Sequence, residues 1–380
     1  MVQAYIGLDV HKTTISIAIA FLGNDAPVSY GKCSSDINRF LTALRRLMKK
    51  YSFEKKDIML CYEAGPCGFV LARHLLRIGF RVLVIAPSLI PRQSGNKFKT
   101  DKRDAKELAR HFRSGNLTPV HIPDESDEVI RDLCRARTDA VDDSRRSRQR
   151  LLSFLLRNGH HYTGKSHWTA AHMRYLRELV LQNPSQKMIL EEYLQTIDTN
   201  MQRVADLEEN MRTLQAVWSR RKFAEALQGF RGFQLVASMI ITSELGDLTR
   251  FSHPRKLMAY LGLVPTEDSS GDRRRQGTIT KCGNSHARWL LVEVAECYRY
   301  DPKISRALSY RQEGLSKAIK ELSWRAQKRL NQRYVRLAMR RLHKNKIKVA
   351  IARELAAFIW ELGQILEKES SIPDSQRYAA

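Results

Sequence analysis

The first 123 residues alternate strand and helix signals, and this alternation limits the fold more than any other feature of the chain. Residues 5–23, "YIGLDVHKTTISIAIAFLG", are β-branched and partly alternating, which is typical of one strand turning into a second. A third strand is expected at 27–33, before a helix at 36–51 with apolar residues at helical spacing. Strand, helix, strand and helix segments then follow at 57–65, 68–79, 81–87 and 101–115. Strands followed by alternating helices and strands predict an α/β domain with a mixed sheet over residues 1–123.

Two long helices are expected over residues 124–217. Residues 124–158 contain no glycine or proline, so they are expected to form a single helix. A second helix is expected at 186–217, and its apolar residues recur at the seven-residue spacing of a coiled coil: Ile197, Val204 and Met211. We expect residues 124–217 to form a helical coiled-coil arm that pairs chains. Two helices packed into a core are the alternative.

Residues 218–380 are expected to form a mainly α-helical C-terminal domain. Gly229 and Gly232 open an apolar helix, as in helix-hairpin-helix modules, whose turn offers backbone amides to a DNA phosphate. Within residues 260–291 we expect a polar, glycine-containing loop between apolar helices. The rest is expected to be helical, with a basic, amphipathic first half.

The charge of the chain indicates a polyanionic partner. Its 65 lysines and arginines exceed its 40 acids and give a formal net charge of +25. Nucleic acid is the commonest partner for such a surplus, and a merely solvated basic surface is the alternative. The six cysteines form no C-x-x-C pair, so we expect reduced thiols and not zinc ligands or disulfides. No signal peptide or bilayer-spanning run is recognisable, which favours a cytoplasmic protein without a membrane partner.

Four carboxylates are candidates for a metal site. Asp9 lies inside the first expected strand, where a charge is costly unless it is paired or binds a cation. Glu63 ends a later strand, at the sheet edge where α/β domains place their sites. Asp101 and Asp104 begin a helix, where they either cap it or supply two further ligands. Oxygen ligands of this kind hold divalent cations that promote phosphoryl transfer. His11 is expected to share the face of Asp9 and is a candidate substrate contact.

One competing interpretation uses the first strand. Residues 5–20 are also similar to the phosphate-binding hairpin of actin-like kinases and Hsp70-type ATPases. That hairpin needs a small glycine close to the phosphate, whereas His11 and Lys12 stand there in this chain. A second glycine-rich phosphate loop is also missing from the sequence, which disfavours this interpretation.

Four stretches, in order, resemble the motifs of the DEDD-type transposases of bacterial insertion sequences: "YIGLDVHKTTISIAI", "CYEAGPCGFVLARHL", "KFKTDKRDAKELAR" and "YLGLVPTEDSSGDRRRQGTITKCGNSHARWLL". That family includes the bridge-RNA-guided recombinases and is related to the Piv-type DNA invertases. The resemblance implies a RuvC-like, RNase H-like N-terminal domain that binds Mg²⁺ or Mn²⁺. The matching ligands and catalytic acids are Asp9, Glu63, Asp101 and Asp104.

The resemblance also implies a serine nucleophile that joins covalently to the cut DNA end. Ser270 matches best, and Ser269 is adjacent to it. Family members assemble as dimers and tetramers in which the acids and the serine of one active site come from different chains. They use a structured RNA from the element to select donor and target DNA. The candidate nucleic-acid contacts are basic: Lys99, Lys102, Arg145, Arg146, Arg148, Arg273, Arg274, Arg275, Lys281 and Arg288.

Three functional hypotheses follow from the sequence. The leading one is an RNA-guided DNA transposase or recombinase that acts in the bacterial cytoplasm, in association with the nucleoid. The second is a metal-dependent nuclease of Holliday-junction type, in which water attacks and Ser270 is idle. The third is a nucleic-acid-binding protein without catalysis. Gly283, Asn284 and Arg288 match the resembled C-terminal motif and either contact phosphate or form a turn.

Overall fold

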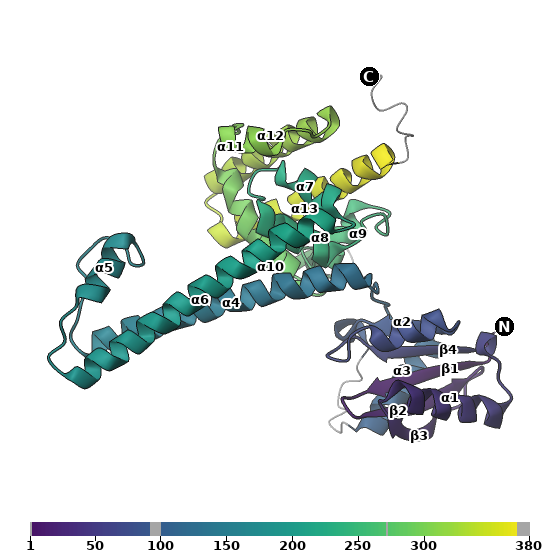
Figure 1. Cartoon of the computed structure of the whole chain (residues 1–380). Coiled ribbons are helices and arrows are strands. Elements are labelled where there is room, and N and C mark those ends of the chain that lie inside the picture. The colour runs from purple at the N-terminus through teal and green to yellow at the C-terminus, as the bar shows by residue number, and fades with distance from the viewer. Residues whose placement is uncertain (1, 92–99, 271–272, 371–380) are drawn as a thin grey trace. The chain divides into compact units, whose positions relative to one another are not determined.

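The computed structural model describes residues 2–91, 100–270 and 273–370 (Figure 1). The chain forms two compact units. The first comprises Met1–Asp124 and the short segment Thr280–Gly283, and the second comprises Glu125–Ile279 and Asn284–Ala380. The three-part division expected from the sequence, with boundaries near 124 and 217, stays a prediction.

A five-stranded mixed sheet organises the first unit, which confirms the expected α/β architecture. Its strands, in the spatial order β3-β2-β1-β4-β5, are β1 (Ala4–Val10), β2 (Thr14–Phe21), β3 (Val28–Ser34), β4 (Ile58–Glu63) and β5 (Arg81–Ile85). The first three strands pair antiparallel, and β4 is parallel to both β1 and β5. This arrangement is consistent with the RNase H-like fold of DEDD domains.

Helices cover both faces of this sheet (Figure 1). The first face packs on α1 (Ile37–Tyr51) and α2 (Val70–Arg77) through alternate strand residues such as Leu8 and Tyr62. The opposite face packs on α3 (Asp101–Arg113), whose Ala105 and Ala109 lie against Ala18 and Ala20. Because successive strand residues point to opposite faces, Asp9 and Glu63 belong to the α3 side.

Gly7 sets how closely α3 approaches the sheet. A Cβ atom on this glycine would lie 2.4 Å from the Ala105 carbonyl oxygen and 2.6 Å from the Ala109 amide nitrogen. Both atoms are backbone, so they cannot move aside without moving the helix. The missing side chain therefore lets α3 rest directly on β1, two residues before Asp9.

Two long helices begin the second unit, as the sequence predicted. They are α4 (Glu125–Arg157) and α6 (Pro184–Val217), which contact each other and are joined through α5 (Ala170–Glu178) (Figure 1). Ile197 and Met211 are buried, whereas Val204 is half-buried. The coiled-coil character of this arm, and its pairing of chains, stay predictions.

The rest of the second unit is mainly helical, as expected. Its helices are α7 (Arg221–Gln228), α8 (Leu235–Leu245), α9 (Pro254–Tyr260), α10 (Ser285–Ala295), α11 (Arg306–Arg311), α12 (Lys317–Met339) and α13 (Lys344–Ser370). All of them except α11 contribute buried residues to one hydrophobic core, in which α8 is almost fully buried. Among the described residues, no helix is long and apolar enough to span a bilayer.

One expectation was wrong in this region. The polar segment between α9 and α10 is not only a loop, because it contains an antiparallel pair of strands, β6 (Pro265–Ser270) and β7 (Arg273–Ile279). The pairing aligns Glu267 with Gln276. Backbone hydrogen bonds between the strands stabilise this pair, so the apolar alternation that usually marks strands is not required.

Candidate functional site

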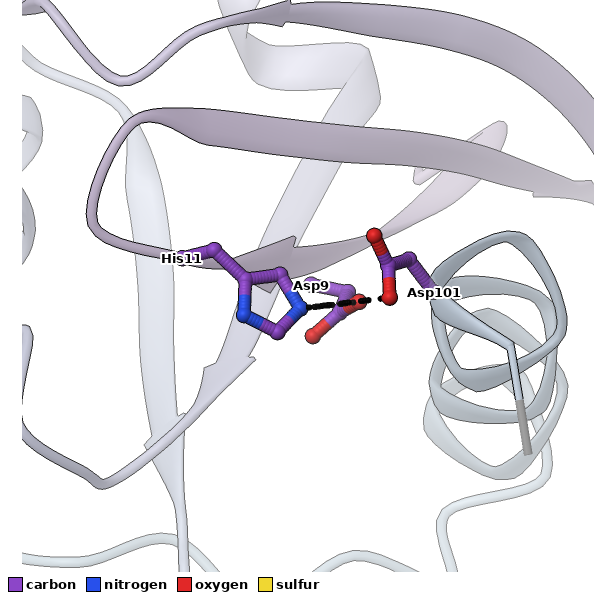
Figure 2. Close-up of side chains that lie close together, drawn as sticks. All are labelled: Asp9, His11 and Asp101. Carbon is purple, nitrogen blue, oxygen red and sulfur yellow. Dashed lines mark hydrogen bonds and ion pairs between the residues drawn. The ribbon is translucent and has the colours of Figure 1, made fainter.

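Asp9, His11 and Asp101 converge beside the carboxyl end of β1 (Figure 2). The His11 Nε2 atom lies 3.1 Å from Asp9 Oδ2 and 3.5 Å from Asp101 Oδ1. One donor atom from each of the three residues lies within 4.8 Å of the others. The side chain of Asp9 is only 18% exposed, whereas those of His11 and Asp101 are half exposed at 51% and 44%. The cluster is thus open to solvent on one side.

Strand register places Glu63 next to this cluster along the sheet edge. Leu8 of β1 pairs with Tyr62 of β4, so Asp9 and Glu63 are the next residues of two adjacent parallel strands. Glu63 is exposed, and Asp104 lies one turn after Asp101 on α3. Neither belongs to the three-residue group. The structure thus brings Asp9 and Asp101 together and sets Glu63 and Asp104 beside them.

The first turn of α3 does not use Asp101 as its cap. Thr100 occupies the N-cap position, and its side chain makes no capping hydrogen bond. Asp101 is instead the first helical residue, and its Oδ2 atom accepts a hydrogen bond of 3.0 Å from Lys32 Nζ. The capping role that the sequence offered for Asp101 is therefore wrong. Acidic residues in a first turn still favour the positive end of the helix dipole.

Two of these carboxyl groups have shifted pKa values in opposite directions. Burial raises the pKa of Asp9, and repulsion from Asp101 and Asp104 adds to this, while His11 acts against it. The hydrogen bond from Lys32 lowers the pKa of Asp101. Closely spaced acids with few donors gain most from a cation, because it removes both the repulsion and the desolvation cost.

Lys32 was not recognised from the sequence. It lies on β3, 69 residues from its partner, and nothing in the local pattern links the two residues. A hollow beside α3 is lined by Ser16, Lys32, Asp101 and Lys102, among others. Lys102 was a predicted nucleic-acid contact, and here it stands at the rim of the acid cluster.

The other predicted contacts are dispersed, and among them Lys281 belongs to the first unit and the arginines to the second. Arg145 and Arg146 lie on α4 and pair with Asp142 and Asp143, one turn earlier. Arg148 stacks over the Trp168 ring at 5.4 Å. Lys281 is exposed with a positive φ of 56°. Arg288 donates to the Leu261 carbonyl, which indicates a structural role for this side chain.

The candidate serine lies at the end of a strand. Ser270 is the last residue of β6, and its backbone is in register with Arg273, the first residue of β7. Ser269 aligns with Arg274 in the same way, and Arg275 follows on β7. The side chains of residues 268–275, as well as Lys99, lie outside the described residues. The role of this serine stays a prediction.

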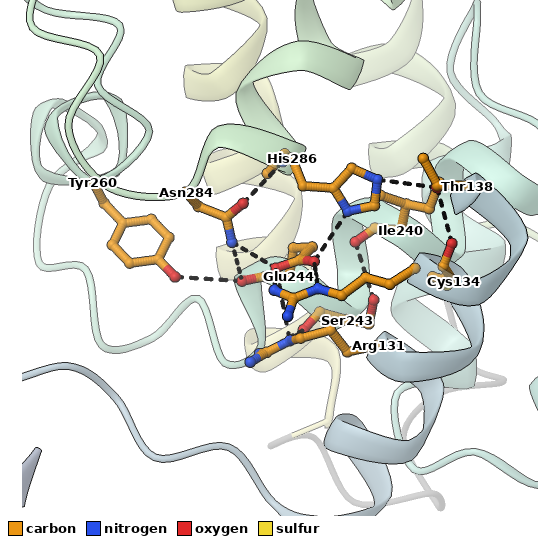
Figure 3. Close-up of polar contacts among 11 residues, drawn as sticks. Arg131, Cys134, Thr138, Ile240, Ser243, Glu244, Tyr260, Asn284 and His286 are labelled. Carbon is orange, nitrogen blue, oxygen red and sulfur yellow. Dashed lines mark hydrogen bonds and ion pairs between the residues drawn. The ribbon is translucent and has the colours of Figure 1, made fainter. Parts of the chain in front are cut away.

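Glu244, a buried carboxylate of α8, binds residues of α4 and of the start of α10 (Figure 3). It accepts hydrogen bonds from Arg135 at 2.9 and 3.2 Å and from Asn284 at 2.7 Å, and it lies 3.1 Å from His286 Nδ1. Burial acts to raise the pKa of Glu244, but bonds from His286, Arg135 and Asn284 outweigh it and lower the pKa to about 2. Asn284 also caps α10. Asn284 therefore has a structural role, and an acid within an apolar helix was the signal for this site.

Comparison with known proteins identifies the family. The family model described as the transposase family IS116/IS110/IS902 matches residues 224–310, and a DEDD model of IS110 elements, described as a transposase, matches residues 6–158. The protein called "Putative transposase y4qE" of Sinorhizobium fredii is 39% identical over 369 residues, which cover 97% of this chain and 90% of that protein. The chain belongs to the IS110 family of transposases.

Other relatives of this IS110-family transposase are named for insertion sequences. The transposase for insertion sequence element IS1533 of Leptospira borgpetersenii is 28% identical, covering 89% of the chain and 98% of that protein. The transposase for insertion sequence element IS1111A of Coxiella burnetii is 24% identical, covering 80% of the chain and 77% of that protein. The DEDD match includes Asp9, Glu63, Asp101 and Asp104 within its limits. A transposase with a DEDD-type domain is consistent with divalent-metal use.

Proposed function

We propose that this transposase cuts and joins DNA by metal-assisted attack of Ser270 on a DNA phosphate, guided by a structured RNA. One observation supports the metal-binding part of this proposal most directly. The donor atoms of Asp9, His11 and Asp101 lie within 4.8 Å of one another. Glu63 and Asp104 would complete the ligand set from the adjacent strand end and the next helical turn.

The chemistry of these side chains fits a hard divalent cation. Carboxylate oxygens are the preferred ligands of Mg²⁺ and Mn²⁺, and imidazole nitrogen is tolerated better by Mn²⁺. Burial, and to a lesser extent repulsion from Asp101 and Asp104, raises the pKa of Asp9, and a bound cation would relieve both effects. When bound, the metal would neutralise charge on the scissile phosphate and stabilise its transition state.

The serine step conserves phosphodiester bonds. Ser270 Oγ forms a bond to the scissile phosphorus, gives up its proton, and breaks the bond to a deoxyribose oxygen, which takes up a proton. The product is a phosphoserine ester and a free DNA hydroxyl. Attack of another DNA hydroxyl on this ester restores a phosphodiester and the serine. Arg273, Arg274 and Arg275 would supply the positive field that favours serine deprotonation.

The partners follow from the same proposal. The structured RNA would pair with donor and target DNA, and the arginines of α4 would contact its backbone. Dimers or tetramers would form composite sites, each with the acids of one chain and the serine of another.

Adduct trapping tests the nucleophile. Purified protein, RNA from the flanking element, Mg²⁺ and labelled donor and target DNA are mixed and resolved on denaturing gels. Wild type is compared with Ser270→Ala, Ser269→Ala and Asp101→Asn. We expect a labelled protein–DNA band that Ser270→Ala and Asp101→Asn abolish and Ser269→Ala retains.

Three other outcomes reassign the chemistry. Cleaved DNA without any adduct, unaffected by either serine change, identifies a hydrolytic nuclease. DNA binding without cleavage in every variant and in wild type, with or without metal, identifies a binding protein. An adduct lost only in Ser269→Ala moves the nucleophile by one residue.

A further inference from the structure

The hairpin of α12 and α13 concentrates positive charge in one part of the chain. Between Glu321 and Glu354, residues 322–353 contain eleven lysines and arginines and no aspartate or glutamate. The two helices contact each other. The distribution of acids between them determines which of these cations are neutralised.

An ion-pair ladder joins the two helices only in the half remote from their connecting turn. Arg325 pairs with Glu361, and Arg329 and Arg333 pair with Glu354 at 2.6 and 3.2 Å. The ladder stops at Glu354, because α13 has no acid between its start and that residue. Nearer the turn, α13 therefore offers no acid to the cations of α12.

Four exposed cations at the turn have no acidic partner among the described residues: Arg336, Arg340, Arg341 and Lys346. The neighbouring Lys344 and Lys348 differ, since both reach Glu296, at 3.1 and 3.8 Å. We call the four unpaired residues the turn surface. Their mutual repulsion is uncompensated within the second unit.

The position of Lys346 at the start of α13 is also electrostatically unfavourable. Lys346 lies in the first turn of a 27-residue helix, where the dipole disfavours positive charge, and this turn contains no acid. Packing does not explain the four side chains either, because all are exposed. A set of charges that destabilises the free protein is most simply matched by an anionic partner.

We propose that the turn surface binds the phosphate backbone of duplex DNA independently of sequence. Because the chain belongs to a family of transposases, we commit to DNA as the occupant, and duplex RNA is the alternative that the test separates. Arg336 and Arg340, the C-cap residue of α12, stand four residues apart, roughly 6 Å along the helix axis, so they can contact neighbouring phosphates of one strand. The surface would hold flanking DNA, and it depends neither on Ser270 nor on the metal.

The test is the salt dependence of binding to a labelled random-sequence 30-bp duplex, measured by fluorescence anisotropy with full-length protein. The variant replaces all four residues of the turn surface with glutamine. The matched control removes the same charge from exposed cations of α1: Arg39, Arg45, Arg46 and Lys49. We expect the slope of log K against log salt to fall by about 3 to 4 in the variant, since each phosphate contact contributes about 0.9. The control should keep the wild-type slope.

Three results overturn the proposal. They are an unchanged slope in the variant, an equal loss in variant and control, and a loss seen with duplex RNA of the same sequence but not with DNA. The thermal midpoint of the variant should equal or exceed that of wild type, because repulsion is removed. If the fourfold variant does not fold, the double change Arg336→Gln and Arg340→Gln should lower the slope by about 2.

Discussion

The buried Glu244 and the partly buried Asp9 of this transposase show how partners decide the effect of burial on the pKa of a carboxyl group. Glu244 has three side-chain donors, and its pKa falls to about 2. Asp9 has His11 as its donor and two acids nearby, and its pKa is raised. The first is therefore a satisfied structural charge, whereas the second is a group that a cation would stabilise. At the scale of single residues, this contrast distinguishes Glu244, which stabilises the fold, from Asp9, a candidate metal ligand.

The lowered pKa of Glu244 predicts an acid-sensitive second unit. A carboxyl group whose folded-state pKa is about 2, against an ordinary 4.5, stabilises the fold above pH 4.5 and loses this effect as pH falls toward 2. Glu244→Gln should lower the free energy of unfolding at pH 7 by roughly 3 kcal/mol and flatten the acid dependence in this window. Urea unfolding at several pH values measures both effects.

Glu361→Gln is the control for this measurement. Glu361 pairs with Arg325 on the surface, so its loss should cost less than about 1 kcal/mol. Parallel stability curves for Glu244→Gln and wild type from pH 2 to 7 would refute the structural role of Glu244.

Lys32 should weaken metal binding at Asp101. Its ammonium group holds Asp101 Oδ2 at 3.0 Å, so a cation must compete with it for that oxygen. The pair is half exposed, so solvent screens it and this competition is weak. Lys32→Met should therefore tighten Mn²⁺ binding by up to about fivefold, measured by calorimetry. Lys49→Met, on α1, should leave the affinity unchanged, and weaker binding in Lys32→Met would contradict the competition.

At the scale of elements, the contact of α3 with β1 decides where the helical acids stand. Gly7 permits this contact, and α3 then carries Asp101 to Asp9. The site is thus built by one strand end and one helix start that pack through a single glycine.

Gly7→Ala should displace α3, because the added methyl group would meet two backbone atoms. We expect a loss of about 1–3 kcal/mol in the stability of the first unit and at least tenfold weaker Mn²⁺ binding. Gly65→Ala is the control, since a Cβ there meets no atom within 4 Å. Thermal unfolding and calorimetry report the two effects, and wild-type values for Gly7→Ala would show that α3 has room to adjust.

The sequence could predict the sheet and its acids because apolar strands mark their own ends. Asp9 and Glu63 stood out as charges in or after apolar runs. Lys32 and Gly7 act through contacts with α3, far along the chain, so no local pattern revealed them. The strands β6 and β7 were missed because their polar residues lack an apolar alternation.

At the scale of the whole molecule, the candidate acids and the candidate serine belong to different compact units. A site composed of two chains would therefore use one unit from each. Mixing Asp101→Asn with Ser270→Ala should restore adduct formation to about a quarter of wild type, because half of the randomly formed dimers contain one intact composite site of two. No recovery in the mixture would indicate sites formed within one chain.

The most direct test of the account is metal binding at the acid cluster. Mn²⁺ titration followed by electron paramagnetic resonance would compare wild type with Asp9→Asn and Asp101→Asn. Glu107→Gln provides a matched control. It also removes a carboxylate from α3, but that carboxylate pairs with Arg110 and is not a candidate ligand. We predict at least tenfold weaker binding in the two aspartate variants and wild-type affinity in the control. Equal affinity in all four proteins would contradict the assignment of this sheet edge as the metal site.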